Sequence, residues 1–231
     1  MEGEVLGRAC AVLIVVDVLS FSTTTDLVLN RGARVLPVRR RDARGVAEAR
    51  TAGAVIAGEH EWTLRPSSVT EIPSGTLLAL ASPNGATLST SAAQTGAHVL
   101  VGCLRNASAT AAKARELAGG NPIGVIPAGE RWGVNMFGDG EHSGPLRPCV
   151  EDHLGADAIV AALARGGGEL SAEAALAAAA YAATDVPTAL RTCTSGTELA
   201  ATGNGNDVIL AAQEDVSDSV PMLSNGILEA P

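Results

Sequence analysis

Short, uniformly apolar runs alternate with longer alanine-rich stretches along this chain of 231 residues. The apolar runs predict buried strands at 11–16, 34–38, 54–57, 76–81, 97–102 and 122–127. The longer stretches predict helices at 22–31, 42–51, 86–95, 106–118, 149–165 and 171–183, with shorter ones near 196–202 and 206–214. Strands that alternate with helices in this way form a mainly parallel or mixed sheet flanked by helices. The pattern therefore predicts an α/β fold.

Two segments interrupt this alternation. Residues 133–148, GVNMFGDGEHSGPLRP, are rich in glycine and too long for a routine connection. They predict a functional loop, although a disordered insertion would show the same pattern. Residues 216–231 predict a short edge element and a tail.

Composition narrows the classes of partner and compartment. Only 2% of the residues are aromatic, so the core must consist of Ala, Val, Leu and Ile, and the formal net charge is −9. This acidity argues against nucleic acid or an anionic membrane as the main partner, although a metal and local arginines can still attract an anionic substrate. The N-terminus lacks the basic start of a secretory signal, the apolar stretch 9–16 is too short to span a bilayer, and the four cysteines form no C-x-x-C pair. We expect a cytoplasmic protein with reduced thiols.

The first candidate site is the segment after the strand at 11–16. Asp17 is followed by a crowd of hydroxyl residues, namely Ser20, Ser22, Thr23, Thr24 and Thr25. A helix that begins near Ser22 leaves main-chain N–H groups unpaired, and its dipole favours an anion there. The segment therefore suits a phosphate or a sulfonate. Helix capping and packing are the structural alternative, but a cap needs only one Ser or Thr.

Two other strand ends carry polar residues. Asn84 and Gly85 belong to a Pro-Asn-Gly turn, and Arg105 and Asn106 precede another predicted helix. Ligands of open α/β sheets bind where strands end, so both junctions are candidates. Asn-Gly is nevertheless a common turn, and Asn106 could be a helix cap and nothing more.

The strongest signal pairs VIPAGERW with GPLRPCVEDHLGAD. The first delivers Glu130 and Arg131 at a strand end, and the second places Arg147 before a helix whose first turn holds Glu151 and Asp152. The carboxylates are hard oxygen ligands suited to Mg²⁺, and the arginines suit phosphate or sulfonate oxygens. Acids in a first helical turn also stabilise the helix dipole, which is their structural explanation. Acids and arginines around a loop indicate phosphoryl transfer.

Other chemistries fit less well. The chain has no G-x-x-x-x-G-K-[ST] motif, no G-x-S-x-G elbow and no H-E-x-x-H spacing. A haloacid-dehalogenase-type phosphatase would need an aspartate two residues after Asp17, where this chain has Leu19.

An ordered set of motifs spanning almost the whole chain resembles the 2-phosphosulfolactate phosphatase family. The motifs are VDVLSFSTTT, AGE, SPNG, GCLRNA, IPAGERW, LRPCVEDHLGADAI, CTSGTEL with Asp207, and DSVPML. The resemblance implies an unusual α/β fold of one compact unit, with two intertwined halves of related topology, approximately 1–120 and 121–231. It also implies a Mg²⁺-dependent phosphomonoesterase that converts 2-phospho-3-sulfolactate, an intermediate on a route to coenzyme M, to 3-sulfolactate and phosphate.

On the positions that match these motifs we place hypothetical roles. The hypothetical catalytic residues are Asp17, Glu130 and Arg131. The hypothetical Mg²⁺ ligands are Glu130, Glu151 and Asp152. The hypothetical substrate-binding residues are Ser22, Thr23, Thr24, Asn84, Gly85, Asn106 and Arg147.

One segment departs from the family's pattern. Residues 58–69 have His60 where the family usually has Arg, and they lack its Asn-Ser-Pro stretch. Two alternatives therefore stay open: a phosphatase for another metabolite, such as a sugar acid or nucleotide, and a non-catalytic anion-binding protein. The oligomeric state is also open, a homo-oligomer included.

Overall fold

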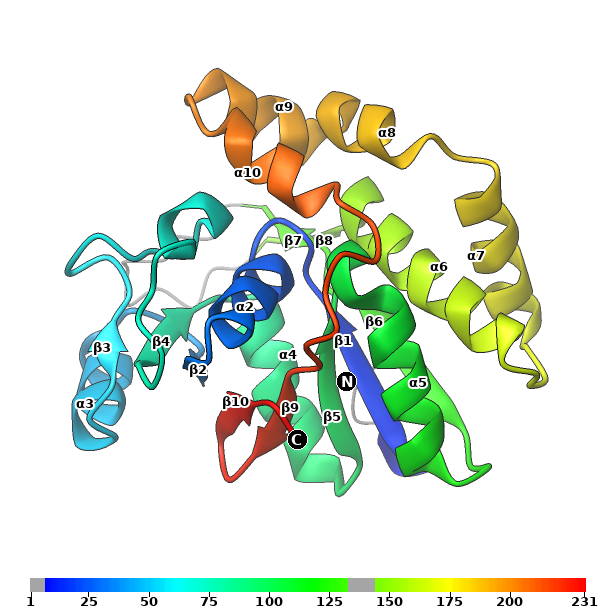
Figure 1. Ribbon diagram of the computed structural model, residues 1–231, viewed down its shortest axis with the longest axis horizontal. Coiled ribbons are helices and arrows are strands. Elements are labelled where there is room, and N and C mark those ends of the chain that lie inside the picture. Colours follow the sequence, from blue (N-terminus) through cyan, green and yellow to red (C-terminus); the bar gives the residue numbers. More distant parts are fainter. Residues whose placement is uncertain (1–6, 133–143) are drawn as a thin grey trace.

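The computed structural model describes residues 7–132 and 144–231, so most of the loop expected to be functional, 133–148, lies outside the described residues. An eight-stranded sheet is flanked by helices, and β7 and β8 form a separate small hairpin (Figure 1). This is the α/β fold that the sequence predicts. The strands are β1 (Val12–Val16), β2 (Arg34–Val38), β3 (Val55–Ile56), β4 (Leu77–Ala81), β5 (His98–Gly102), β6 (Ile123–Pro127), β7 (Glu130–Arg131), β8 (Leu146–Arg147), β9 (Met222–Ser224) and β10 (Ile227–Glu229).

All predicted strands and helices are present, with ends shifted by at most a few residues. The α-helices are α2 (Phe21–Asn30), α3 (Ala43–Thr51), α4 (Gly85–Ala92), α5 (Ala107–Ala118), α6 (Val150–Arg165), α7 (Ala172–Ala182), α8 (Val186–Thr192), α9 (Thr194–Ala201) and α10 (Gly205–Ala211). Short 3₁₀ turns lie at η1 (Pro66–Val69), η2 (Ala93–Thr95) and η3 (Leu104–Asn106). The sequence pattern missed α8, η1 and the β7–β8 hairpin because elements this short show too little periodicity.

The C-terminal segment lies in the middle of the sheet and not at its edge. The strand order is β3-β4-β2-β10-β9-β5-β1-β6. Neighbours pair in parallel within β3-β4-β2 and within β5-β1-β6, and the antiparallel β9–β10 hairpin joins the two groups. The predicted edge element at 216–231 is therefore wrong. The hydrophobic pattern of a three-residue strand carries no information about its partners.

Strand β1 lies between β5 and the edge strand β6 and is buried along its whole length. Val12, Ile14 and Val16 pack in the same apolar cluster as residues of α5 and α6. The alternate residues, Leu13 and Val15, pack with residues of α4 and β5. A strand covered on both faces needs apolar residues at every position, which explains its uniform sequence.

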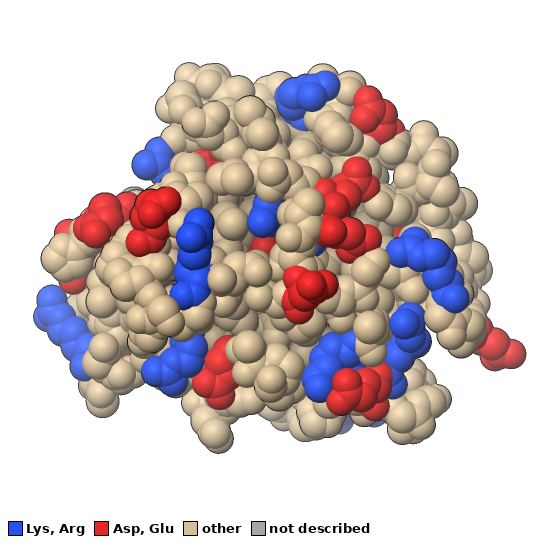
Figure 2. All heavy atoms as spheres, viewed as in Figure 1, with Lys and Arg blue, Asp and Glu red and all other residues tan. Residues whose placement is uncertain are grey.

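The carboxyl end of β1 lies beneath a group of C-terminal helices. Figure 1 shows α8, α9 and α10 lying across the end of the molecule at which β7 and β8 also lie. On the face drawn in Figure 2, acidic and basic side chains are interspersed, with no continuous basic stripe. Within the described residues, no helix combines the length and apolar character needed to cross a membrane.

Candidate active site

Asp17 follows β1 directly, and its carboxylate accepts hydrogen bonds from the first residues of two helices. Its Oδ1 accepts from the main-chain N–H of Phe21 at 3.3 Å, and its Oδ2 accepts from that of Gly85 at 2.8 Å. Phe21 begins α2 and Gly85 begins α4. One carboxylate therefore pairs unsatisfied donors at the start of both helices, where the helix dipoles also favour negative charge.

Ser82 and Gly85 complete the contact between α4 and Asp17. The Ser82 Oγ donates to Asp17 Oδ2 at 3.1 Å and accepts from the Gly85 N–H at 3.0 Å. A Cβ at position 85 would lie 2.4 Å from Phe21 Cδ1 and 2.7 Å from Asp17 Oδ2. Gly85 is therefore needed for this close approach, and the structure gives it a packing role beside the predicted binding role.

Asp17 holds its proton more tightly than an ordinary aspartate. Burial raises the pKa of Asp17 to about 6, although the hydrogen bonds from Gly85 and Phe21 lower it. The charge of Glu130 raises this pKa further. A carboxyl group whose pKa lies this near to neutral can take up or release a proton at working pH.

Glu130, in β7, is only partly buried, and its charge acts on Asp17. Its Oε1 accepts from Asn84 Nδ2 and from the main-chain N–H of Arg131, each at 2.9 Å. The predicted residues Asn84 and Glu130 are therefore brought together, but Asn84 orients the acid in this arrangement. A direct contact of Asn84 with substrate stays a prediction.

Asp152 connects the loops that follow β1 and β6. Its Oδ1 accepts from the Val18 N–H at 2.7 Å, and its Oδ2 accepts from the Gly129 N–H at 2.9 Å. Burial raises the pKa of Asp152 well above its ordinary value, and the charges of Asp17 and Glu151 raise it further. Asp152 therefore adds a second buried acid to the Asp17 centre.

The predicted metal ligands are only partly brought together. Glu151 lies beside Cys193 of the segment before α9, and it contributes to the raised pKa of that thiol. Across residues 7–132 and 144–231, no group of three or more His, Cys, Asp or Glu side chains is arranged to hold a metal ion. The set Glu130, Glu151 and Asp152 is not assembled in this conformation, and a Mg²⁺ site stays a prediction.

The hydroxyl residues after Asp17 have structural partners. The hydroxyls of Thr23 and Thr24 donate to the carbonyls of Val18 and Leu64, at 2.7 and 2.6 Å. The Ser22 Oγ accepts from the main-chain N–H of Asp17 at 2.8 Å. All three side chains are buried. These contacts match the capping and packing alternative, and a substrate-binding role for the three hydroxyls stays a prediction.

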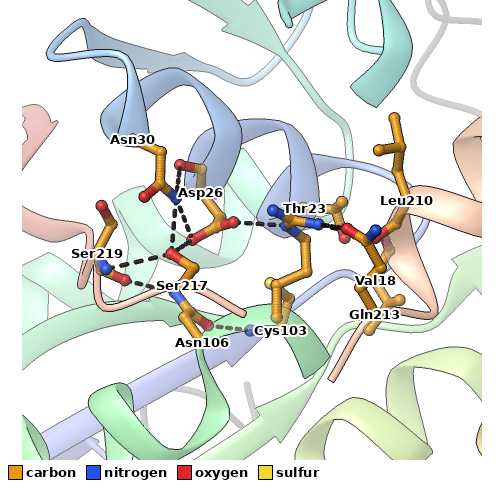
Figure 3. Close-up of polar contacts among 11 residues, drawn as sticks. Val18, Thr23, Asp26, Asn30, Cys103, Asn106, Leu210, Gln213, Ser217 and Ser219 are labelled. Carbon is orange, nitrogen blue, oxygen red and sulfur yellow. Dashed lines mark hydrogen bonds and ion pairs between the residues drawn. The ribbon is translucent and has the colours of Figure 1, made fainter. Parts of the chain in front are cut away.

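Asn106 likewise has main-chain partners at both ends of its amide. Its Oδ1 accepts from the Cys103 N–H, and its Nδ2 donates to the Ser219 carbonyl, each at 2.9 Å. Figure 3 shows Asn106 beside the C-terminal segment that carries Ser217 and Ser219. Asn106 holds the N-cap position of α5, but its side chain makes no cap hydrogen bond to that helix. The amide instead accepts at the start of η3 and fastens the C-terminal segment there. A substrate-binding role for Asn106 stays a prediction.

The two predicted arginines lie on opposite faces of the β7–β8 hairpin. Arg147 pairs across the hairpin with Glu130, whereas Arg131 pairs with Leu146. Directly opposed side chains share a face and successive ones alternate, so Arg147 and Glu130 share one face and Arg131 projects from the other. Arg131 is exposed, and its predicted catalytic role stays a prediction.

The sequence pattern missed Ser82 and Ser195 as members of the site. Ser82 follows β4 directly, so its position at a strand end was a usable signal. Ser195 contacts Arg147 from 48 residues away, and no spacing rule predicts such a contact.

Two comparisons relate the chain to known proteins. A family described as 2-phosphosulpholactate phosphatase matches residues 4–226. The chain is 30% identical over 224 residues to the 2-phosphosulfolactate phosphatase of Methanothermobacter thermautotrophicus, a match covering 94% of this chain and 88% of that protein. It is 29% identical over 229 residues to a probable 2-phosphosulfolactate phosphatase of Deinococcus radiodurans, covering 93% and 88%.

Proposed function

The chain belongs to the 2-phosphosulpholactate phosphatase family, and we propose that it hydrolyses a small anionic phosphomonoester, 2-phospho-3-sulfolactate being the leading candidate. The observation that carries this proposal is the meeting of Asp17, Glu130 and Asp152 at the end of β1. Burial raises the pKa values of both Asp17 and Asp152, the charge of Glu130 raises that of Asp17 further, and the charge of Asp17 raises that of Asp152 further. Acids whose pKa values are displaced together are typical of catalytic centres.

A divalent cation fits the chemistry of this centre. Buried carboxylates that raise one another's pKa lose that repulsion when a cation lies between them. Mg²⁺ usually takes only one or two carboxylates and completes its coordination with water and substrate oxygens, so a group of three acids is not required. We assign Glu130 as the leading ligand because it is the least buried of these acids, with Asp152 and Glu151 as the other candidates. A bound Mg²⁺ would neutralise charge on the phosphoryl oxygens and acidify a water molecule.

The chain's own residues supply positioning and proton transfer. Asp17, with a pKa of about 6, is ionised often enough near neutral pH to accept a proton from the attacking water. Asn84 holds the Glu130 carboxylate through the 2.9 Å hydrogen bond from its Nδ2. Arg147, on the same face of the hairpin as Glu130, supplies positive charge for a substrate oxyanion.

The test is phosphate release from a panel of phosphomonoesters by the wild-type protein in Mg²⁺. The panel holds 2-phospho-3-sulfolactate, a phosphorylated sugar acid, a nucleoside monophosphate and glycerol 2-phosphate. We expect the highest kcat/KM with 2-phospho-3-sulfolactate. Preference for another ester would keep the phosphatase and change its substrate. Binding of the esters without release from any of them would contradict the proposal and favour an anion-binding protein.

A further inference from the structure

Arg147 has one edge of its guanidinium group incompletely paired. The Arg147 Nε is buried and has no hydrogen-bond partner in the part of the chain that the structure describes. The Nη2 on the same edge donates to Ser195 Oγ at a long 3.4 Å and lies 3.6 Å from Glu198 Oε2. A buried N–H without an acceptor is costly, so this edge is suited to a further oxygen ligand.

The guanidinium plane is held in place independently of that edge. Its central carbon lies 5.0 Å from the ring centroid of Trp132, a distance at which a cation and an aromatic face attract each other. The backbone of Arg147 is fixed opposite Glu130 in the β7–β8 hairpin. The edge is therefore presented in a set direction on the face of the hairpin that also carries Glu130.

Glu198 is a weakly held partner of this edge. The side chain of Glu198 is 61% exposed, whereas that of Arg147 is 15% exposed. An ion pair with so exposed a carboxylate is worth little, because water screens it and the glutamate loses side-chain freedom. A better-placed anion can therefore displace Glu198 at small cost.

We propose that the Nε–Nη2 edge of Arg147 binds a second anionic group of the substrate, a carboxylate or sulfonate, and that Glu198 competes with that group for the edge. Two parallel N–H donors match the spacing of two oxygens in either group. Ser195 adds a hydroxyl to the same subsite from α9. The inference rests on the proposed phosphatase function, and it predicts a preference for phosphomonoesters with a second acidic group. It also makes α9, which carries Ser195 and Glu198, part of substrate selection.

The test compares Glu198→Gln with Glu116→Gln, a matched loss of one exposed negative charge on α5. With 2-phospho-3-sulfolactate, Glu198→Gln should lower KM by up to roughly fivefold relative to the control variant, the most that removal of an exposed ion pair is worth. With glycerol 2-phosphate, which has no second acid, the two variants should have the same KM. Equal KM values for the two variants with both substrates would overturn the inference.

Direct binding separates this inference from the proposed function. Calorimetric titration with 3-sulfolactate, which has no phosphoryl group, should show up to roughly fivefold tighter binding to Glu198→Gln than to Glu116→Gln. That result without hydrolysis of any ester would keep the subsite and reject the phosphatase. Hydrolysis of both esters with equal 3-sulfolactate affinities would keep the phosphatase and reject the subsite, as would the absence of 3-sulfolactate binding.

Discussion

Asp17→Asn lowers phosphate release roughly 10²- to 10⁴-fold while the protein stays folded, the range expected when a general acid–base group is removed. Asparagine keeps the shape of the side chain, but its single acceptor oxygen can serve only one of the N–H groups of Phe21 and Gly85, which bind separate oxygens of Asp17. It also cannot take a proton from water. The measurement is kcat with the best phosphomonoester of the panel, together with unfolding by urea. Release within threefold of the wild type would remove Asp17 from the mechanism.

The same substitution changes how stability depends on pH. The pKa of Asp17 in the folded chain, about 6, lies above that of an aspartate in an unfolded chain. The folded state therefore binds the proton more tightly, and the free energy of unfolding falls as the pH rises from about 4 to about 6. Asp17→Asn has no group to titrate there, so it should lose less stability than the wild type between pH 4 and pH 7.

Asp157→Asn is the matched control. Burial also raises the pKa of Asp157, in α6, to about 6. Removal of the Asp157 carboxyl group should likewise reduce the pH dependence of the free energy of unfolding, while kcat stays at the wild-type value. Equal loss of activity in both variants would mean that buried acids support the fold and not the reaction.

Arg105→Met destabilises the protein by about 3–5 kcal/mol, the cost of leaving a buried charge without its partner. The Arg105 Nε lies 2.7 Å from Asp26 Oδ2, and the two side chains are 8% and 0% exposed. Asp26 also accepts from Ser217 and Asn30, so the pair fastens α2 to the C-terminal segment (Figure 3). Without Arg105, Asp26 keeps only these neutral donors.

The measurement is urea unfolding at pH 7, with Lys113→Met as the control. Lys113 and Glu116 form an ion pair of similar length, 2.9 Å, but the Glu116 side chain is 68% exposed. Loss of this pair should cost at most about 0.5 kcal/mol. A cost of less than 1 kcal/mol for Arg105→Met would show that the buried pair contributes little to the fold.

The core strands could be predicted from sequence because a strand buried on both faces has apolar residues at every position. Strand β1 reads as a continuous apolar run since Val12, Ile14 and Val16 face one layer of helices and Leu13 and Val15 face the other. The position of β9 and β10 could not be predicted. Their insertion between β2 and β5 depends on long-range pairing that two three-residue strands do not encode.

For the site, position along the sequence predicted which acidic residues lie there, but it did not predict their hydrogen-bond partners. Asp17, Glu130 and Asp152 follow strands or begin a helix, and such positions can be recognised along the chain. Whether a hydroxyl faces a ligand or a carbonyl depends on the fold, as Thr23 and Thr24 show with their main-chain acceptors. Glu130 and Arg131 are adjacent in sequence and were predicted to act together. Because the β7–β8 hairpin was not predicted, neither was the projection of their side chains from its opposite faces.

The central claim is that the acids at the end of β1 form a metal-assisted phosphatase centre. Its most direct test is phosphate release from 2-phospho-3-sulfolactate by the wild-type protein in EDTA, followed by addition of excess Mg²⁺. The account predicts no release in EDTA and full release once Mg²⁺ is added. Undiminished release in EDTA, or none under either condition, would contradict it.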